Sequence, residues 1–149
     1  MRKSMMAAVA ATILAGAAFG ALPATAAEHQ VQMLNKGADG PMSFEPSFLK
    51  IAPGDTVRFV ATDKGHNVLS VEGMGPAGAT PFQGKMNEDL TVTFDKPGVY
   101  GFECKPHYGM GMVGLIVVGD PVNLAEAQAV PQKGKAKKHF ETLFGNVGQ

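Results

Sequence analysis

Hydrophobic and polar residues alternate in short runs between residues 29 and 118, and turn-forming residues separate the runs. Alternation with a period of two is typical of half-buried β-strands, because successive side chains of a strand point to opposite faces. Residues 56–62 show the pattern most clearly, since Val57 and Phe59 fall on one face and Arg58 falls on the other. The regular spacing of runs and turns predicts a mainly β fold, a sandwich of seven or eight strands.

The predicted strands end at strong turn sequences, in which proline presets one backbone angle and glycine permits a positive one. Two such turns are Pro53-Gly54-Asp55 and Asp95-Lys96-Pro97-Gly98. Residues 73–84 contain several glycines and prolines with little periodicity, and we expect a long loop there. The strands that these breaks leave are residues 29–35, 44–51, 56–62, 66–71, 90–94, 99–104 and 113–118.

The period of the pattern changes near the end of the chain, at residues 123–130 and 135–144. In the second of these segments Ala136, Phe140 and Leu143 fall on one helical face, which Phe144 extends. We therefore expect two C-terminal α-helices that pack this face on the sandwich. The expected organisation is a β-sandwich over residues 27–120 and a helical extension over residues 121–149.

The first 26 residues have the features of a secretory signal peptide and are excluded from the expected fold. Arg2-Lys3 precede an apolar stretch that ends in the small residues Ala24-Thr25-Ala26. A membrane anchor would need about 20 strongly apolar residues. This stretch is rich in alanine, and glycines and Pro23 interrupt it. We expect cleavage after Ala26 or Ala27, export of the mature chain, and no membrane anchor after cleavage.

The composition excludes several classes of protein. The 149 residues carry 13 basic and 13 acidic side chains, so the chain lacks the basic excess with which nucleic-acid-binding proteins neutralise phosphates. With 17% charged residues, 19 glycines and 10 prolines, it is also unlike a disordered or coiled-coil chain. The composition is typical of a compact domain with many turns, and we expect no nucleic-acid partner.

Cys104 is the single cysteine of the chain, so it forms no intramolecular disulfide. An unpaired thiol in an oxidising compartment is open to oxidation, and its presence calls for burial, catalysis or a metal. His107 follows three residues later and Met112 five residues after that, so all three side chains can lie in one loop between two strands. If a strand brings His66 alongside, the set becomes two imidazoles, a thiolate and a thioether.

That set of donors is typical of a copper site with two histidines, a cysteine and a weak axial methionine. The sulfur donors suit Cu(I) and the imidazoles suit Cu(II), so a rigid scaffold that holds them predicts one-electron transfer by a single copper ion. Taken singly, His66 is typical of a surface histidine, and either methionine is typical of core packing. Met110 is the alternative axial ligand. We favour Met112, because the adjacent glycines Gly111 and Gly114 would allow close approach of the backbone to the metal.

Two other functions are compatible with these residues. Cys104 with His107 as its base could serve a thiol enzyme, although the sequence offers no evident oxyanion site. A copper chaperone or storage protein would use similar ligands. Sites of that kind are usually open and exchange metal, whereas four ligands in a closed loop favour retention.

The chain resembles the pseudoazurins, periplasmic blue copper proteins of the cupredoxin family, over essentially the whole mature sequence. The spacing of Cys104, His107 and Met112 is shared with the plastocyanins. The interval between the first histidine and Cys104, together with the two C-terminal helices, selects the pseudoazurins. The motifs that carry the resemblance are Met33-Leu34-Asn35-Lys36-Gly37, Phe44-Glu45-Pro46, Gly65-His66-Asn67, Cys104-Lys105-Pro106-His107 and Tyr108-Gly109-Met110-Gly111-Met112.

The resemblance implies a cupredoxin Greek-key β-sandwich, a periplasmic location and a monomeric electron carrier that is not an enzyme. It implies one copper ion with four protein ligands, which are His66, Cys104, His107 and Met112. Asn67 resembles the residue that ties the two ligand loops together beside the cysteine sulfur. Pro106 and Met42 resemble residues that flank the exposed imidazole.

The partners that the resemblance implies are periplasmic redox enzymes such as nitrite reductases. They would bind at an apolar patch around His107 that lysines surround. The lysines at matching positions are Lys36, Lys64 and Lys85. One departure concerns this ring, since Glu103 and Lys105 flank Cys104 where the family commonly has lysine and threonine. Charges at a rim mainly set the rate of encounter, so we expect transient, salt-sensitive docking.

Cleavage after Ala26 would leave a chain that starts with Ala27-Glu28-His29. A free amine, two amides and an imidazole in that order can bind a square-planar Cu(II) or Ni(II) ion. The simpler expectation for the same residues is an ordinary first strand.

Overall fold

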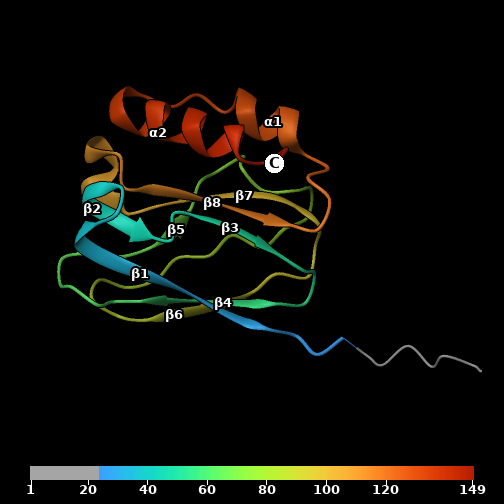
Figure 1. Ribbon diagram of the computed structural model, residues 1–149, viewed down its shortest axis with the longest axis horizontal. Helices are drawn as coiled ribbons and strands as arrows, with labels where there is room; N and C mark the ends of the chain where they lie inside the picture. Colours follow the sequence, from blue (N-terminus) through green and yellow to red (C-terminus); the bar gives the residue numbers. More distant parts are fainter. Residues whose placement is uncertain (1–23) are drawn as a thin grey trace, which may run out of the picture.

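Eight β-strands form two four-stranded sheets within residues 24–149, the part of the chain that the computed structural model describes (Figure 1). Two helices follow the last strand, so the predicted mainly β sandwich with two C-terminal helices is confirmed. The predicted signal peptide lies outside the described residues except for its last three, residues 24–26.

The first sheet contains the beginning of the described chain. Its strand order is β2-β1-β4-β6, and β1 runs parallel to β4 but antiparallel to β2. Residues of β4 alternate as predicted, with Val57 and Phe59 buried and Arg58 exposed. The strands of this sheet are β1 (Glu28–Gly37), β2 (Gly40–Glu45), β4 (Thr56–Val60) and β6 (Leu90–Thr93).

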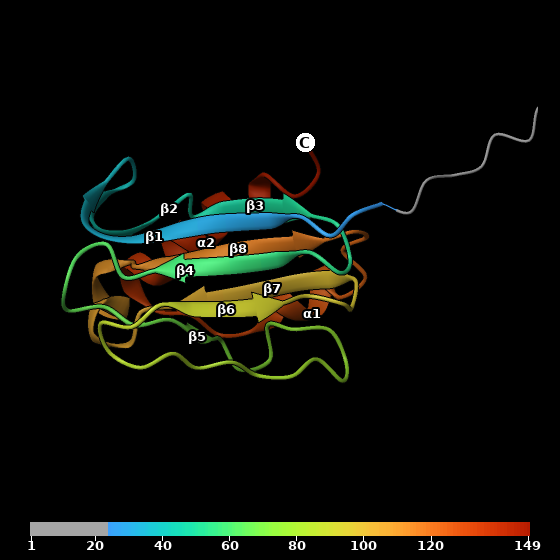
Figure 2. The same ribbon diagram turned by 90° about the horizontal axis from the view of Figure 1, so that it is seen from below.

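The second sheet has the order β3-β8-β7-β5 and lies above β1, β4 and β6 in Figure 1. Its strands are β3 (Phe48–Ile51), β5 (Leu69–Ser70), β7 (Gly98–Glu103) and β8 (Val113–Val118). The antiparallel pair β7 and β8 forms the middle of this sheet, with Glu103 opposite Val113 at one end and Gly98 opposite Val118 at the other. Figure 2 shows that the axes of the strands in both sheets are roughly aligned, although the strands point both ways along them, as in aligned sandwiches.

All six residues of β8 are buried, because both faces of this strand are covered. Ile116 and Val118 pack with β1, β2 and β4 residues in the core between the sheets. Val113, Leu115 and Val117 pack on the other side, against the C-terminal helices. The continuous apolar run at residues 113–118 therefore reflects a central strand between two hydrophobic layers.

The helices α1 (Leu124–Ala129) and α2 (Gly134–Gly145) form a third layer on the outer face of the second sheet (Figure 1). Ala136, Phe140 and Leu143 are buried against that sheet, and Phe144 is half-buried beside them, as the helical pattern predicted. Within residues 24–149, no helix combines the length and the hydrophobicity that a membrane span requires.

The structure differs from the sequence-based expectation in two segments. Residues 44–51 are not one strand: β2 ends at Glu45 and β3 begins at Phe48, and the two strands belong to different sheets. Residues 66–71 form only the short strand Leu69–Ser70. The segment before it pairs with a loop instead, since the carbonyl of His66 accepts the N–H of Asn87 at 2.9 Å.

Candidate metal centre

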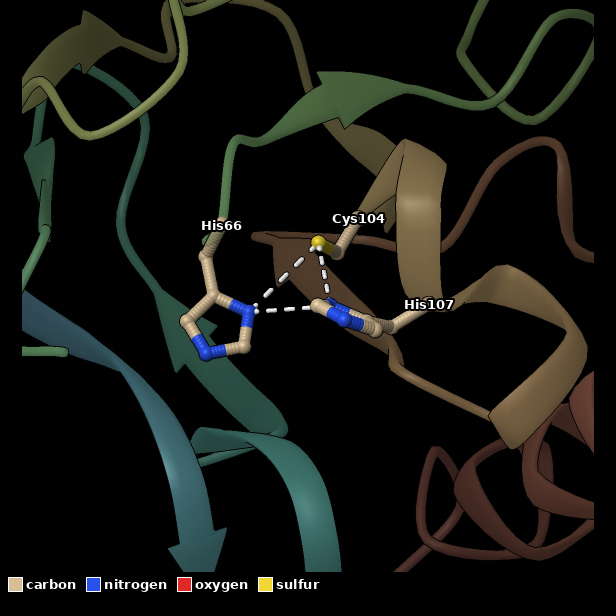
Figure 3. Close-up of side chains that lie close together, drawn as sticks. All are labelled: His66, Cys104 and His107. Atoms are coloured by element: carbon tan, nitrogen blue, oxygen red, sulfur yellow. Dashed lines mark hydrogen bonds between the residues drawn. The ribbon is translucent and has the colours of Figure 1, made fainter. Parts of the chain in front are cut away.

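Three side chains from separate parts of the chain converge at one end of the sandwich (Figure 3). His66 lies in the loop between β4 and β5, Cys104 follows β7 directly, and His107 lies in the short 3₁₀ helix η1 (Lys105–Met110). The Cys104 Sγ is 3.7 Å from His66 Nδ1 and 3.5 Å from His107 Nδ1. The two Nδ1 atoms are 3.1 Å apart.

Met112 lies opposite Cys104, one position beyond the last pair of the β7–β8 ladder, Glu103 and Val113. The Cys104 N–H donates to the Met112 carbonyl at 3.0 Å. The Met112 side chain is fully buried in the same hydrophobic cluster as Cys104, whereas Met110 is 44% exposed. Of the two methionines considered as the axial ligand, Met112 is the one that lies in the interior beside Cys104.

The loop between Cys104 and Met112 is held by its own backbone. The Cys104 carbonyl accepts the N–H of His107, and the His107 carbonyl accepts the N–H of Met112, both at 3.2 Å. Pro106 occupies the beginning of η1, where a missing N–H costs no hydrogen bond. Gly111 ends the helix with a φ of 87°, a left-handed conformation that glycine adopts without strain. The result is a short, internally bonded loop that turns back to β8.

Gly114 has a different role from the one that its position near Met112 suggested. A Cβ at this position would lie 2.1 Å from the ring of Phe102 on β7. The glycine therefore makes room for an aromatic core residue on the neighbouring strand, and close approach of the backbone to a metal does not explain it.

Two asparagines hold the loops that carry the converging residues. The Asn67 side-chain oxygen accepts the N–H of Lys105 at 3.0 Å, which links the His66 loop to η1 as the family resemblance implied. The Asn35 side-chain oxygen lies 3.0 Å from Nε2 of His66. Because this oxygen can only accept, Nε2 carries the hydrogen and Nδ1 presents its lone pair to Cys104 and His107. Asn35 lies in the motif Met33-Leu34-Asn35-Lys36-Gly37, and no local sequence pattern indicates its contact with His66.

Burial shifts the titration of the two buried members of the centre. It lowers the pKa of His66, and the nearby His107 lowers it further, while Asp63 opposes the shift. Burial raises the pKa of the Cys104 thiol, and backbone N–H groups of Asn67 and His107 oppose this effect. A neutral imidazole is ready to bind a metal, and the thiol becomes a thiolate when a cation compensates its charge.

The arrangement fits a metal ion held by two nitrogens and one sulfur. The three separations of 3.1–3.7 Å suit donors that share one ion, since metal bonds to histidine nitrogen and cysteine sulfur are about 2.0–2.3 Å long. Two histidines and a cysteine with a methionine nearby are the ligand types of blue copper sites. His66 and Cys104 are buried, while His107 is only partly buried, so this imidazole connects the centre with the surface.

Comparisons with known proteins agree with this chemistry. Residues 31–119 match the family described as copper binding proteins, plastocyanin/azurin family. A pseudoazurin from Paracoccus pantotrophus is 47% identical over 143 residues, which cover 95% of this chain and 96% of that protein.

Solved structures give the same result. The crystal structure of a pseudoazurin from Methylobacterium extorquens AM1 has 45% sequence identity and a TM-score of 0.78, covering 80% of this chain and 98% of that one. A native pseudoazurin from Hyphomicrobium denitrificans has 44% identity and a TM-score of 0.78, covering 82% and 99% of the two chains. The chain therefore belongs to the plastocyanin/azurin family of copper binding proteins, and within it to the pseudoazurins, blue copper proteins that carry electrons and are not enzymes.

Proposed function

We propose that four side chains bind the copper ion through which this protein transfers single electrons: His66, Cys104, His107 and Met112. The convergence of the first three, with donor atoms 3.1–3.7 Å apart, is the observation that carries the proposal. The burial of Met112 beside Cys104 supports it as the axial ligand. When bound, copper supplies a centre that alternates between Cu(I) and Cu(II).

The protein's contribution is to hold these donors in one arrangement for both oxidation states. Hydrogen bonds within the loop fix His107 and Met112 relative to Cys104. Asn35 orients the His66 ring, and Asn67 joins the His66 loop to η1. Because the ligands need not move when an electron enters or leaves, the reorganisation energy is small and transfer is fast.

Substitution of the cysteine tests the ligand set. Copper-loaded wild-type protein is expected to absorb strongly in the visible region when oxidised and to lose this absorption on reduction. The substitution C104S should abolish the absorption, because it removes the thiolate. M112Q should keep the absorption and lower the reduction potential, whereas M110Q, at the exposed methionine, should change neither. Strong absorption in C104S, or equal effects of M112Q and M110Q, would contradict the assignment.

The rival function as a copper chaperone or storage protein makes a different prediction. Two of the three converging residues are buried, so copper should leave the site slowly. Rapid loss of copper to a weak chelator would favour the chaperone. Retention of the metal through cycles of oxidation and reduction supports the electron carrier.

Electrons would enter and leave through His107, whose ring is partly exposed. The apolar side chains on this end of the molecule are Met42, Pro106 and Met110, and we call them the His107 patch: Pro106 directly precedes His107, and Met42 and Met110 line one surface hollow. Met110 is 44% exposed, which is high for methionine. An apolar surface of this kind excludes water from a contact and allows a partner to approach the imidazole closely.

The partner would be a periplasmic redox enzyme such as a nitrite reductase, with an acidic surface around its electron entry site. The lysines that would form a positive ring around the His107 patch are Lys36, Lys64, Lys85 and Lys105, and all four are exposed. Glu103 is partly buried whereas Lys105 is exposed, so of the two residues that flank Cys104 the lysine is more accessible to a partner. The docking of a monomer through such a rim would be transient.

The salt dependence of electron transfer tests this docking. The second-order rate constant with a nitrite reductase from the same source should fall as salt is added. K64A and K85A should lower the rate at low salt and have little effect at high salt. K96A is the matched control, because Lys96 precedes β7 and lies at the end of that strand opposite to Cys104. A rate that does not fall with salt would contradict electrostatic docking.

We also propose that residues 1–26 are removed on export to the periplasm, leaving a sandwich over residues 27–120 and a helical extension over residues 121–149. Ala27 N lies 2.9 Å from a carboxylate oxygen of Asp55, so cleavage after Ala26 would create an amine beside a negative charge. Cleavage one residue later would remove that contact. Mass spectrometry of exported protein should find Ala27 as the first residue, and Glu28 would contradict this.

The structure favours the ordinary strand over a second metal site at residues 27–29. Glu28 begins β1, and the Ala27 nitrogen and the His29 Nε2 each contact an oxygen of Asp55, at 2.9 and 2.8 Å. A square-planar site would require the Ala27 nitrogen to leave Asp55 and the first residues of β1 to leave their pairing with β4. Titration of copper-free protein with Cu(II) should therefore find one tight site, and a second would revive the alternative.

A further inference from the structure

The helix α2 contacts the loop that carries the proposed ligands through the side chain of His139. Its Nδ1 lies 2.8 Å from the carbonyl oxygen of Gly111. A carbonyl oxygen can only accept, so Nδ1 donates this hydrogen bond. The His139 side chain is 19% exposed, and its other nitrogen lies 3.5 Å from a carboxylate oxygen of Asp39 in the turn between β1 and β2. His139 thus joins the helix to the ligand loop and to the first sheet.

The Gly111 carbonyl accepts two hydrogen bonds, one from His139 and one from within the loop. The second comes from the N–H of Val113 at 2.9 Å and closes a three-residue turn with Met112 at its centre. The N–H of Gly111 donates to Tyr108, and the N–H of Met112 donates to His107. The direction of the Gly111 carbonyl therefore determines the path of the backbone on both sides of Met112.

The surroundings of Gly111 restrict it further. Its φ of 87° lies in the left-handed region, and a Cβ at this position would lie 3.3 Å from the Cβ of Lys135 on α2. The helix is therefore packed against the loop at the same residue whose carbonyl His139 holds. A displacement of α2 would therefore move Gly111, the residue before Met112.

We propose that His139 is a positioning residue for Met112, through which α2 helps to set the strength of the axial thioether and hence the reduction potential. This inference rests on the ligand set proposed above. The axial ligand tunes the potential of sites with two histidines and a cysteine. Groups that orient metal ligands from outside commonly matter nearly as much as the ligands themselves. Without the His139 hydrogen bond the turn around Met112 loosens, the thioether donates more weakly, and the potential rises.

Three substitutions of His139 separate this role from simple packing. H139L removes the donor and keeps an apolar side chain of moderate size. H139N restores a donor near the position of Nδ1, whereas H139Q offers its amide nitrogen closer to the position of Nε2, which faces Asp39. L143A is the matched control, because Leu143 is buried on the same helix and belongs to the hydrophobic cluster under it.

The readouts are the reduction potential and visible spectrum of the copper-loaded protein, and the hydrogen exchange of the Val113 amide in the copper-free protein. H139L and H139Q should raise the potential, alter the relative intensities of the visible bands and speed exchange at Val113. H139N should return all three toward wild type. L143A should lower the thermal midpoint of unfolding and leave the potential unchanged.

Two results would overturn the positioning role. One is a shift of potential in L143A as large as that in H139L, which would mean that helix docking in general is responsible. The other is equal behaviour of H139N and H139Q. Failure of the ligand set itself would be seen separately, because M112Q would then leave the potential unchanged.

Discussion

Asn35 holds the ring of His66 from outside the metal centre, with its side-chain oxygen 3.0 Å from Nε2. Its own N–H donates to Asp63 at 2.7 Å, so the asparagine is fixed at the end of β1 while it orients the histidine. A ligand whose ring is already oriented loses less freedom when it binds metal. The Asn35 contact therefore contributes to the affinity of the site for copper.

Removal of the Asn35 side chain should weaken copper binding. We expect N35A to lower the affinity roughly 10–100-fold, the usual cost of losing a group that orients a metal ligand. Q32A, which truncates another exposed polar residue of β1, is the control and should bind copper as wild type does. Competition with a chelator of known affinity measures both. Unchanged affinity in N35A would show that the His66 ring is oriented without this hydrogen bond.

The residues proposed as ligands could be predicted from the sequence because three of them lie in one loop, where spacing alone limits their geometry. Asn35 could not be predicted in the same way, since its contact with His66 joins residues 31 positions apart in the chain. Gly114 was predicted for the wrong reason. Its need for space depends on Phe102 of the neighbouring strand, and strand pairing cannot be derived from a local motif.

Gly114 illustrates how the central strands depend on each other. The Phe102 ring of β7 occupies the space in which a Cβ of residue 114 on β8 would lie. We expect G114A to destabilise the fold by roughly 1–3 kcal/mol, the usual cost of overpacking a well-filled core. G109A is the control, because nothing lies within 4 Å of a Cβ built there. Urea unfolding measures both, and equal stabilities would mean that β7 and β8 adjust without strain.

Asp55 fixes the beginning of β1 against the turn between β3 and β4. It accepts hydrogen bonds from the N–H groups of Ala27 and Ala52, at 2.9 and 3.1 Å, and contacts His29 at 2.8 Å. These contacts, the Ala27 bond first, lower the pKa of Asp55 from 3.8 to about 2. The carboxylate thus stabilises the fold only while it is ionised.

The contribution of Asp55 to the free energy of unfolding should decrease in acid. Because the pKa is lower in the folded state, the stabilisation is complete above about pH 4 and is lost as the pH falls toward about 2. The difference in stability between wild type and D55N should be constant near neutral pH and shrink over that interval. Denaturant unfolding of the copper-free proteins measures it. A difference that does not change with pH would show that the charge of Asp55 is unimportant.

The elements themselves were predicted well where the pattern was long and regular. Residues 113–118 and both helices were found nearly at their observed limits. Residues 44–51 were predicted as one strand, because apolar residues continue through the segment. The chain passes from one sheet to the other between Glu45 and Phe48, and a sequence pattern does not reveal such a change of partner.

At the scale of the whole molecule, the hairpin of β7 and β8 lies between two hydrophobic layers, and the loop that joins these strands meets the His66 loop at the metal centre. The first sheet packs on one face and α1 and α2 pack on the other (Figure 1). Close-packed interiors resist small displacements. The fold therefore provides a rigid frame, and the same ligand arrangement can serve both oxidation states of the metal.

X-ray absorption at the copper edge, recorded on oxidised and reduced protein at neutral pH, tests this account most directly. It should find one copper ion with two nitrogen donors and one short bond to sulfur in both states, and bond lengths that change little between them. The absence of a sulfur donor, or the gain or loss of a ligand on reduction, would contradict a rigid centre built from His66, Cys104 and His107.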